Sequence, residues 1–296
     1  MLSMKKRKTK LIHDEIANNL MYYIIHHIDT DLNLDAIAKD FNVSKFHLHR
    51  IFKEQLNANI YETIKSVRLQ KAANLLIANK NHTITEIGNM CGYSILTSFL
   101  RAFKSRFGQT PKQWRNGGYI THFHKIINQE NRLLFANSDF SHLKPKIATI
   151  KDREVYYVRY RGYNNAKFAR EKLMVWAQSN HIGSHHRIEV YYDNPAITSL
   201  DQCYYVACIE PVDTKIPINA SLPKSHIRGG VYAVFTMDGD YDDILRLIQW
   251  AYQHWLPSRG FSTVTASSYC IFEENNNLDN QKRYKCLYHL PIGLCL

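Results

Sequence analysis

Residues 92–104 read GYSILTSFLRAFK, and a related pattern occurs about fifty residues earlier in the chain. Tyr93-Ser94 repeats Val43-Ser44 at an offset of 50, whereas Arg101–Lys104 repeats Arg50–Lys53 at an offset of 51. A pattern that occurs only twice excludes a solenoid, which needs three or more stacked repeats. The region from residue 16 to residue 115 therefore contains one supersecondary unit used twice.

Each unit is predicted to be a short helix, a tight turn and a second helix, because apolar residues recur at spacings of three and four. The first unit turns at Asn42-Val43, and Ser44 is the predicted N-cap of its second helix. The second unit turns sharply at Gly92, and Ser94 is the corresponding candidate cap. A helix-turn-helix unit of this kind places its second helix in the major groove of DNA.

The second helix of the first unit has an apolar face and a basic face. Leu48, Ile51 and Phe52 share one side and are expected to pack inward. The opposite side carries basic residues and one aromatic residue, which suit base edges and phosphates: Lys45, Phe46, His49, Arg50 and Lys53. A charged face on a single short helix is usually only solvated, but its repetition in a basic segment favours contact with DNA.

The chain has 38 Lys and Arg residues against 26 Asp and Glu, a formal net charge of +12 over 296 residues. Residues 1–115 hold 18 basic and 9 acidic residues, a net of +9, whereas residues 116–296 hold 20 and 17, a net of +3. A basic balance indicates a polyanionic partner, either nucleic acid or an anionic membrane surface. The uneven split assigns that partner to the first 115 residues.

Several classes of protein are excluded by what the sequence lacks. No apolar run approaches the roughly 18 residues that a membrane-spanning helix needs, and the N-terminus has no signal-peptide core. Six cysteines form no CxxC pair, so the sequence indicates neither a zinc knuckle nor a disulfide scaffold. We therefore predict a soluble cytoplasmic protein that has no contact with a membrane.

Residues 92–115 and 38–53 resemble the signature of the AraC/XylS family of bacterial transcription regulators, and the resemblance covers about residues 16–115. It implies seven helices in two helix-turn-helix subdomains joined by a long helix, here residues 61–79. Such a helix is about 28 Å long at 1.5 Å per residue. It can hold two recognition helices about one duplex turn apart, roughly 34 Å. One chain is then expected to bind DNA as a monomer and to contact RNA polymerase.

The family's base-reading positions carry over to residues of both recognition helices: Phe46, His49 and Arg50 in the first, and Leu96, Thr97 and Arg101 in the second. Lys104 repeats Lys53 as a further basic contact. An arginine paired with guanine O6 and N7 discriminates by about 1–3 kcal/mol. Family members usually have small polar residues where Leu96 and Leu100 stand, so the second helix is expected to read shape or thymine methyls. Residues 4–10 are predicted to be a disordered basic arm.

The second half has a different pattern. Residues 116–146 are predicted to be a linker with some helix and local strand. Beyond them a strand, a helix and two strands occur twice: residues 155–160, 166–180, 187–192 and 203–210, and then 231–235, 241–256, 269–273 and 284–290. The fold class is thus an all-helical double helix-turn-helix domain followed by a duplicated βαββ domain of the α+β class, over residues 147–296, with both helices on one face of an antiparallel sheet. A groove where the two repeats meet is the expected ligand position.

About residues 147–293 resemble the GyrI-like ligand-binding domain, through Tyr160-Arg161-Gly162, Gly239-Asp240-Tyr241, residues 255–257 and Ile271-Phe272-Glu273. The resemblance implies a cleft for amphipathic, often cationic or aromatic, compounds with a glutamate at its floor. Glu273 stands at that motif position, and Tyr192 is its counterpart in the other repeat. The family's tyrosine two places after the glutamate is absent, because Asn275 stands there.

A carboxylate among aromatic faces would bind a delocalised cation by charge pairing and cation–π contact. When empty, such a buried carboxylate needs a raised pKa or a tyrosine hydroxyl to hold it. The remaining candidates for the lining of this effector site are Tyr192, Tyr269, Ile271, Trp176 and Trp250. The two tryptophans have an alternative role as ordinary core residues, and Glu273 has one as an exposed strand carboxylate.

Other chemistry has little support in the sequence. The fifteen histidines form no HExxH motif, and no GxGxxG, Walker A or GxSxG motif occurs. We predict no metal and no cofactor. Cys203 and Cys208 fit a redox switch less well than buried core positions.

The function that these patterns favour is a transcription regulator, not an enzyme, whose promoter binding is controlled by a small effector in the second domain. Two alternatives stay open. One is a hydrolase that uses the cleft glutamate as a general base. The other is a regulator without a ligand, whose second domain binds a protein.

Overall fold

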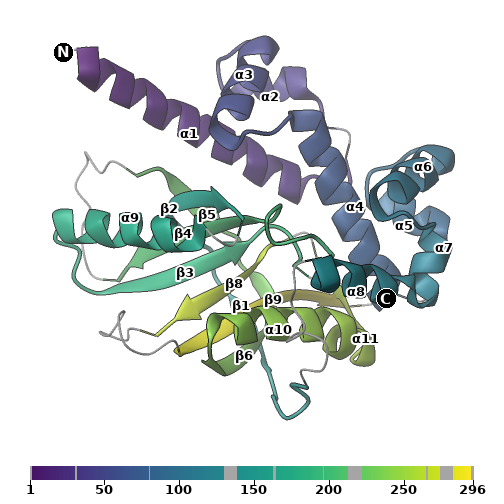
Figure 1. Ribbon diagram of the computed structural model, residues 1–296. Helices are drawn as coiled ribbons and strands as arrows, with labels where there is room; N and C mark the ends of the chain where they lie inside the picture. Colours follow the sequence, from purple (N-terminus) through teal and green to yellow (C-terminus); the bar gives the residue numbers. More distant parts are fainter. Residues whose placement is uncertain are drawn as a thin grey trace.

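The computed structural model describes residues 2–30, 32–79, 81–129, 139–162, 165–195, 197–212, 222–264, 266–273 and 283–294. Its first half is helical and lies beside a sheet built from the second half (Figure 1). The predicted fold class, a helical region with two helix-turn-helix units followed by an α+β domain, is confirmed.

Within the described residues, seven helices precede Trp114, as the family resemblance implies: α1 (Leu2–His26), α2 (Leu34–Asp40), α3 (Lys45–Leu56), α4 (Ile60–Ala78), α5 (Ile84–Met90), α6 (Leu96–Phe107) and α7 (Pro111–Gln113). A π-helical turn, η1 (Trp114–Gly118), and α8 (Tyr119–Gln129) follow. The linking helix predicted for residues 61–79 is α4. Helix α8 lies in the predicted linker, and residues 130–138 lie outside the described part.

Helix α4 belongs to two small hydrophobic cores. Its start, at Ile60 and Ile64, packs with α1, α2 and α3 in the first core. Its later residues, including Leu76, pack with α5 and α6 in the second core. Trp114 is fully buried there and donates a hydrogen bond from Nε1 to the carbonyl of Ala73 at 3.1 Å. One continuous helix therefore sets the spacing of the two units.

The turns of the two units differ in one residue. Ser44 caps α3 as predicted, since its hydroxyl accepts a hydrogen bond from the amide of His47 at 3.2 Å. The prediction that Ser94 caps α6 is wrong: α6 begins at Leu96, and Ile95 occupies the cap position without a side-chain hydrogen bond. The second unit has one extra residue between its turn and its second helix. This residue explains why the offset between the two units changes from 50 to 51. Gly92 has a φ of +77°, as a sharp turn there requires.

The basic segment at residues 4–10 is not a separate arm, because its backbone forms the first turns of α1. The residues there are Lys, Arg, Met and Thr without Gly or Pro, so nothing in them interrupts a helix. The prediction of a disordered arm is therefore wrong.

The second half forms a nine-stranded antiparallel sheet with the order β1-β6-β9-β8-β3-β4-β2-β5, in which β7 pairs with β9. The strands are β1 (Lys146–Ile150), β2 (Arg153–Arg161), β3 (His185–Tyr191), β4 (Tyr204–Pro211), β5 (Lys224–Ile227), β6 (Gly230–Gly239), β7 (Phe261–Thr263), β8 (Ser268–Phe272) and β9 (Tyr284–Leu294). Helix α9 (Ala166–Ser179) follows β2. After β6 come α10 (Tyr241–Trp250), the π-helical turn η4 (Ala251–Trp255) and α11 (Leu256–Ser258).

The strand order is symmetric about the pair β3 and β8. Outward from this pair, β4 and β2 lie on one side and β9 and β6 on the other, which is the arrangement of a duplicated βαββ unit. Glu189 of β3 pairs with Cys270 of β8, and these two residues are 81 positions apart. Tyr192 and Glu273, which the repeat alignment matches, have the same spacing. Glu189 and Cys270 are thus equivalent positions on the pseudo-two-fold axis.

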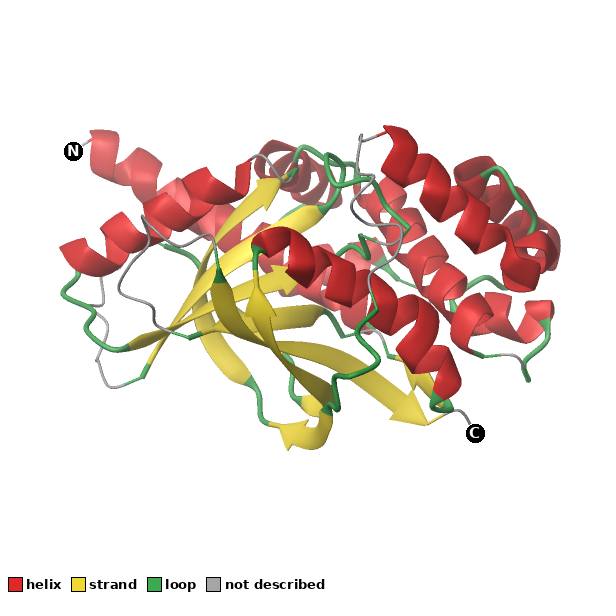
Figure 2. Ribbon diagram, turned by 60° about the horizontal axis from the view of Figure 1, so that its bottom comes forward, coloured by secondary structure: helices red, strands yellow, loops and turns green. Residues whose placement is uncertain are grey.

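The two faces of the sheet have separate cores. Helices α9 and α10 lie across one face (Figure 2) and share the larger core with the sheet. On the other face Ile188 and Val190 belong to a second core. There α1 runs beside the sheet (Figure 1), and its Tyr22 and Ile25 line a small cavity together with Val190. Because side chains alternate along a strand, Glu189 faces the helices.

Candidate functional site

The face of α3 predicted to contact DNA is exposed. Phe46 is 80% exposed, and Arg50 and Lys53 also face solvent, whereas Leu48, Ile51 and Phe52 are fully buried as predicted. Two of the basic residues have acidic neighbours: Lys45 Nζ lies 2.8 Å from Asp35, and Arg50 Nε lies 3.8 Å from Glu54. Exposed pairs of this kind contribute little free energy, so both cations can exchange their partner for a phosphate or a base.

His49 lies half-buried in the same face, with its ring 5.4 Å from that of Tyr61. Burial, and then the charge of Lys45, lower the pKa of His49 below its ordinary value of 6.5. The imidazole is therefore neutral at neutral pH, with one nitrogen able to donate and the other able to accept a hydrogen bond. A neutral side chain of this kind suits a base edge better than a phosphate.

The equivalent face of α6 is less polar. Leu96, Thr97, Arg101 and Lys104 are exposed, as the prediction requires, but Leu96 follows Ile95, which is itself 59% exposed. The opposite side of the helix packs through Phe99, Phe103 and Phe107. The basic residues of α6 are thus confined to its middle and end, while Ile95 and Leu96 present apolar groups at its start beside Thr97. Helices α3 and α6 lie toward opposite ends of α4 (Figure 1).

In the second half, Glu189 is a deeply buried carboxylate at 1% exposure, on the helix-covered face of the sheet. Arg170 of α9 donates from Nη1 to its Oε1 at 3.0 Å, and the hydroxyl of Tyr241 of α10 donates to its Oε2. Burial acts to lower the pKa of Arg170, but the Glu189 carboxylate outweighs it and raises that pKa. Burial and the same carboxylate raise the pKa of Tyr241 well above 10, so its hydroxyl stays a donor.

Tyrosine rings surround this carboxylate. Tyr160 and Tyr191 each lie 5.4 Å from the ring of Tyr205, the first stacked and the second edge-on. The hydroxyls of Tyr160 and Tyr191 are buried near that of Tyr241, without a partner of ordinary hydrogen-bond geometry among the described residues. The guanidinium of Arg170 lies 5.3 Å from the Tyr241 ring. A carboxylate held by a tyrosine among aromatic faces is the chemistry expected of the effector site.

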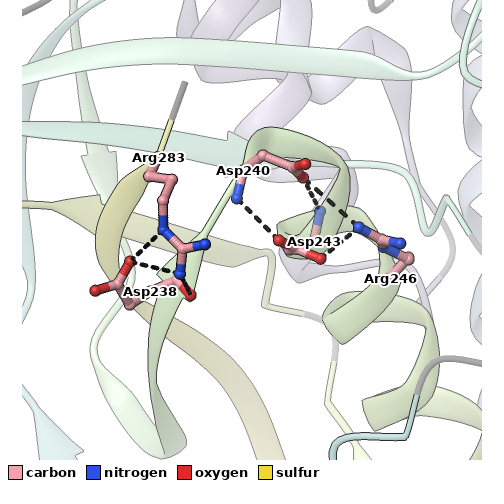
Figure 3. A network of polar contacts seen from close by, with 5 residues as sticks. All are labelled: Asp238, Asp240, Asp243, Arg246 and Arg283. Carbon is pink, nitrogen blue, oxygen red and sulfur yellow. Dashed lines mark hydrogen bonds and ion pairs between the residues drawn. The ribbon is translucent and has the colours of Figure 1, made fainter. Parts of the chain in front are cut away.

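A network of acidic residues and arginines lies at the start of α10 (Figure 3), and the first residue of this helix is Tyr241. Asp240 and Asp243 form a capping box, with Asp243 N to Asp240 Oδ1 at 2.7 Å and Asp240 N to Asp243 Oδ2 at 2.9 Å. Arg246 binds Asp243, and Arg283 joins Asp238 of β6 at 3.3 Å. The network fixes where α10 begins and thereby holds the hydroxyl of its first residue against Glu189.

Glu273 does not lie where the sequence places it. The strand β8 ends at Phe272, and Glu273 is exposed, with its amide donating to the carbonyl of Lys285 at 3.0 Å. In this structure Glu273 does not line a buried cleft among the described residues, so its role as the effector carboxylate stays a prediction. The carboxylate on the axis belongs to the other repeat, where Glu189 stands among Ile188, Val190 and Tyr191. The sequence signal that could have pointed to Glu189 is an acidic residue flanked by apolar residues within a strand.

The other predicted lining residues divide between the two faces of the sheet. Tyr192, Tyr269 and Ile271 pack on the face opposite Glu189, where Tyr269 is fully buried and stacks on His289 at 4.3 Å. Trp176 and Trp250 lie on the helix-covered face. Trp176 stacks on Tyr156 at 5.0 Å, and Trp250 packs near Phe140. The structure does not bring these five residues together into one site.

The loop between β3 and β4 joins the two halves of the molecule through hydrogen bonds to α4. Gln70 Nε2 donates to Asp193 Oδ1, and Gln70 Oε1 accepts from the amide of Asn194 at 3.1 Å. Asn194 Nδ2 donates to Asn74 Oδ1 at 2.8 Å. The second oxygen of Asp193 accepts from the amide of Tyr204 at 2.7 Å, which closes the loop on itself.

The same loop also enters the cores of the helical half. Ile197 is 3% exposed and belongs to the core of the second helix-turn-helix unit. Tyr192 packs against the core of the first unit. Where the loop ends, at the first residue of β4, the hydroxyl of Tyr204 donates to the carbonyl of Leu56, the last residue of α3, at 3.1 Å. One loop therefore contacts both units and the helix that separates them.

Among the described residues no group of three or more His, Cys, Asp or Glu is placed to hold a metal ion. None of the helices in the described part is long and apolar enough to cross a membrane.

Comparisons with known proteins match the helical half and the sheet half of the chain to two different domain families. Residues 37–117 match a helix-turn-helix domain, and residues 143–292 match the GyrI-like small molecule binding domain. The xylose operon regulatory protein of Escherichia coli K12 is 33% identical over 103 residues, which are 35% of this chain and 26% of that regulator. The chain thus spans about a quarter of the length of the xylose regulators that it matches.

Shorter relatives are covered almost completely. The regulatory protein SoxS of Salmonella typhimurium is 33% identical over 104 residues, 35% of this chain and 96% of SoxS. Among solved structures, the C-terminal domain of AraT, a response regulator from Geobacillus stearothermophilus, shares 33% identity with a TM-score of 0.33. It covers 34% of this chain, and the match covers 84% of that domain.

Proposed function

The chain belongs to the AraC/XylS family of helix-turn-helix regulators and carries a GyrI-like small molecule binding domain, and from this premise we propose how the two parts work together. Residues 1–115 bind promoter DNA, and residues 147–296 bind a small effector, with residues 116–146 as the connection. The observation that carries this proposal is the β3–β4 loop, which links the strand bearing Glu189 to the helix that spaces α3 and α6.

On DNA, α3 and α6 read two successive segments of the major groove, and one chain suffices. Arg50 and Arg101 each pair with a guanine, while Lys45, Lys53 and Lys104 neutralise phosphates. Phe46, His49, Leu96 and Thr97 complete the two reading faces. The regulator acts in the cytoplasm and contacts RNA polymerase when bound. The exposure of most of these side chains, with His49 half-buried in the same face, supports this assignment.

The effector site is centred on Glu189, which takes the role that the sequence indicated for Glu273. An amphipathic aromatic cation suits the chemistry of this cluster, because tyrosine faces and a buried carboxylate stabilise a delocalised charge. Such a ligand has to displace the guanidinium of Arg170, which now occupies the carboxylate. Binding therefore moves α9 relative to β3.

An effector can change DNA binding only if it prefers one arrangement of the two domains. Strand β3 ends at Tyr191, two residues before Asp193, so a shift of β3 reaches the hydrogen bonds to Gln70 and Asn74 directly. The insertion of Ile197 into the second core transmits the same shift to α6. The spacing of the recognition helices then depends on the ligand.

Nothing favours the hydrolase alternative. A general base needs an oxygen that is available to accept a proton from water, whereas one oxygen of Glu189 accepts from Arg170 and the other from Tyr241. The relatives named above are regulators. A second domain that binds a protein instead of a ligand is an outcome of the following test.

The test measures the affinity of the full chain for tetraphenylphosphonium, a lipophilic aromatic cation, by calorimetry and by thermal shift. We expect binding to the wild type, loss of at least tenfold in affinity for Glu189→Gln, and unchanged binding for Glu273→Gln, the matched control. The double variant Glu189→Gln with Arg170→Met removes both buried charges and separates loss of the site from loss of the fold. Absence of binding to the wild type would favour the protein-binding alternative.

A further inference from the structure

A second cavity lies between the two halves, apart from the cluster around Glu189. Its volume is about 340 Å³, within the range of roughly 300–1,000 Å³ typical of small-molecule sites. Its walls come from the first helix-turn-helix unit, α4, α6, β2 and the β3–β4 loop. The residues used below are Glu62, Ser66, Arg106, Arg161, Asp193 and Thr198. None of the tyrosines that surround Glu189 lines this cavity.

Arg106 is a largely buried cation that forms no ion pair with a carboxylate of the described residues. It extends from α6, and its Nη1 donates to the hydroxyl of Ser66 at 2.6 Å. Within the described part of the chain, no carboxylate oxygen lies within the 4.0 Å of an ion pair. Burial lowers the pKa of Arg106 from its ordinary value, although a guanidinium remains charged. A buried cation without a counter-ion is unfavourable unless something else supplies the negative charge.

A second guanidinium stands at the same cavity. Arg161, at the end of β2, is exposed, donates from Nη2 to Gln202 and lies 5.3 Å from the Tyr204 ring. The hydroxyl of Thr198 is buried with no hydrogen-bond partner among the described residues. Two cations and one free donor thus line one polar cavity.

The acidic residues of the cavity are already engaged. Both oxygens of Asp193 accept hydrogen bonds, one from Gln70 and one from the amide of Tyr204. Glu62 is exposed and lies 3.7 Å from Lys65. The charge of Asp193 partly offsets the effect of burial on Arg106, but within the described residues it forms no ion pair, and it is one carboxylate beside two guanidinium groups.

We propose that this cavity binds a small anion through a carboxylate or phosphate group, held by Arg106 and Arg161 and by the hydroxyl of Thr198. Guanidinium groups bind such anions through two parallel, charge-assisted hydrogen bonds. Since Arg106 belongs to α6 and Arg161 to β2, the anion connects the second recognition helix to the ligand-binding domain. The anion would be a second effector, opposite in charge to the cation proposed at Glu189.

The experiment titrates the full chain with citrate and with inorganic phosphate at constant ionic strength, by calorimetry and thermal shift. The two anions separate a carboxylate ligand from a phosphate ligand. We expect one of them to bind and to raise the melting temperature of the wild type. Arg161→Gln, at an exposed position that the fold does not need, should lose at least tenfold in affinity. Arg106→Gln should lose the response while its melting temperature without anion stays equal or rises, because the variant removes an unpaired buried charge.

Arg101→Gln is the matched control, because it removes an exposed arginine from the same helix outside the cavity. It should bind the anion like the wild type. Equal loss in all three variants would show general attraction to a basic surface, and an unchanged response in Arg106→Gln and Arg161→Gln would place the anion elsewhere; either result overturns the proposal. Glu189→Gln should leave the anion response unchanged, so failure of this proposal is distinguishable from failure of the effector site.

Discussion

Both halves of the molecule are built from a unit used twice. The two helical units carry the same charged residue at the repeated position, whereas the two sheet units do not. In the helical half each recognition helix exposes an arginine at the repeated position, Arg50 and Arg101. In the sheet half the equivalent positions on the axis are Glu189 and Cys270, of which only one is charged. Successive turns of DNA have the same phosphate backbone, so two recognition helices with similar basic residues can both bind to it. A single cationic effector on the symmetry axis, as proposed above, would need only one carboxylate.

The surroundings of these charges differ as well. The arginines of the recognition helices face solvent, with at most a weak acidic neighbour. Glu189 is buried and depends on Arg170 and Tyr241. Loss of a charge in the helical half should therefore reduce DNA binding and spare the fold. Loss of one in the sheet half should affect the fold first.

The largest effect is expected for Arg170→Met, which leaves Glu189 as a buried carboxylate without its cation. Removal of one partner of a buried ion pair costs about 3–5 kcal/mol of unfolding free energy. The control on the same helix is Lys167→Met, since Lys167 lies 3.8 Å from Glu171 in an exposed pair. That pair should contribute at most about 1 kcal/mol. Urea unfolding measures both, and equal values would show that Glu189 is not the buried charge we describe.

The next effect concerns the two copies in the helical half. Arg50→Ala should weaken promoter binding by about 1–3 kcal/mol and relax specificity at one base pair. Arg101→Ala should weaken binding with a smaller change in specificity, because the first turn of its helix presents Ile95 and Leu96. Fluorescence anisotropy against a set of single-base variants of the site measures both. Equal loss on all sequences for Arg50→Ala would leave it only a phosphate contact.

The sequence alone predicts most of the fold, for a physical reason. Apolar spacing and turn residues determine the helices around Leu48 and Phe103 and the strands of both βαββ units, so these elements appear within a few residues of their predicted bounds. The cap of α6 was missed because propensity favours Ser94 and ignores the extra residue before Leu96.

The buried cluster around Glu189, which we propose as the effector site, was not predicted, because it depends on which side of a strand faces the helices. A family motif led to Glu273, but the strand ends one residue earlier. The pairing of Glu189 with Cys270 across the axis follows from strand register, which a sequence does not display. The contact of Asp193 with Gln70 spans 123 positions and had no local signal.

A smaller effect concerns the pH dependence of stability, which we assign to two histidines: His26 of α1 and His289 of the sheet. Burial, and then the charge of Arg228, lower the pKa of His26 from 6.5 to about 4, and burial lowers that of His289 to about 4. Between pH 6.5 and 4 the unfolded chain binds the proton and the folded chain does not, so stability falls as the pH falls. His26→Gln should remove about 1–2 kcal/mol of this loss, allowing for solvent screening of a half-buried group. Unfolding at pH 7 and pH 4 checks it, and an unchanged pH dependence would contradict the assignment.

The smallest effect compares the two turns. Ser44→Ala should cost about 1 kcal/mol of unfolding free energy, because the hydroxyl caps α3. Ser94→Ala should change stability by less than about 0.5 kcal/mol, because that hydroxyl is exposed and caps nothing in α6. Thermal unfolding of the two variants measures the difference. Equal losses would mean that the units are capped alike.

The central claim is that the β3–β4 loop transmits effector binding to the recognition helices. It is tested most directly by measuring promoter affinity with and without tetraphenylphosphonium, for the wild type and for Gln70→Ala, which removes the hydrogen bonds to Asp193 and Asn194. We predict that both proteins bind the cation equally and that only the wild type changes its affinity for DNA. The same change in both proteins would contradict the account.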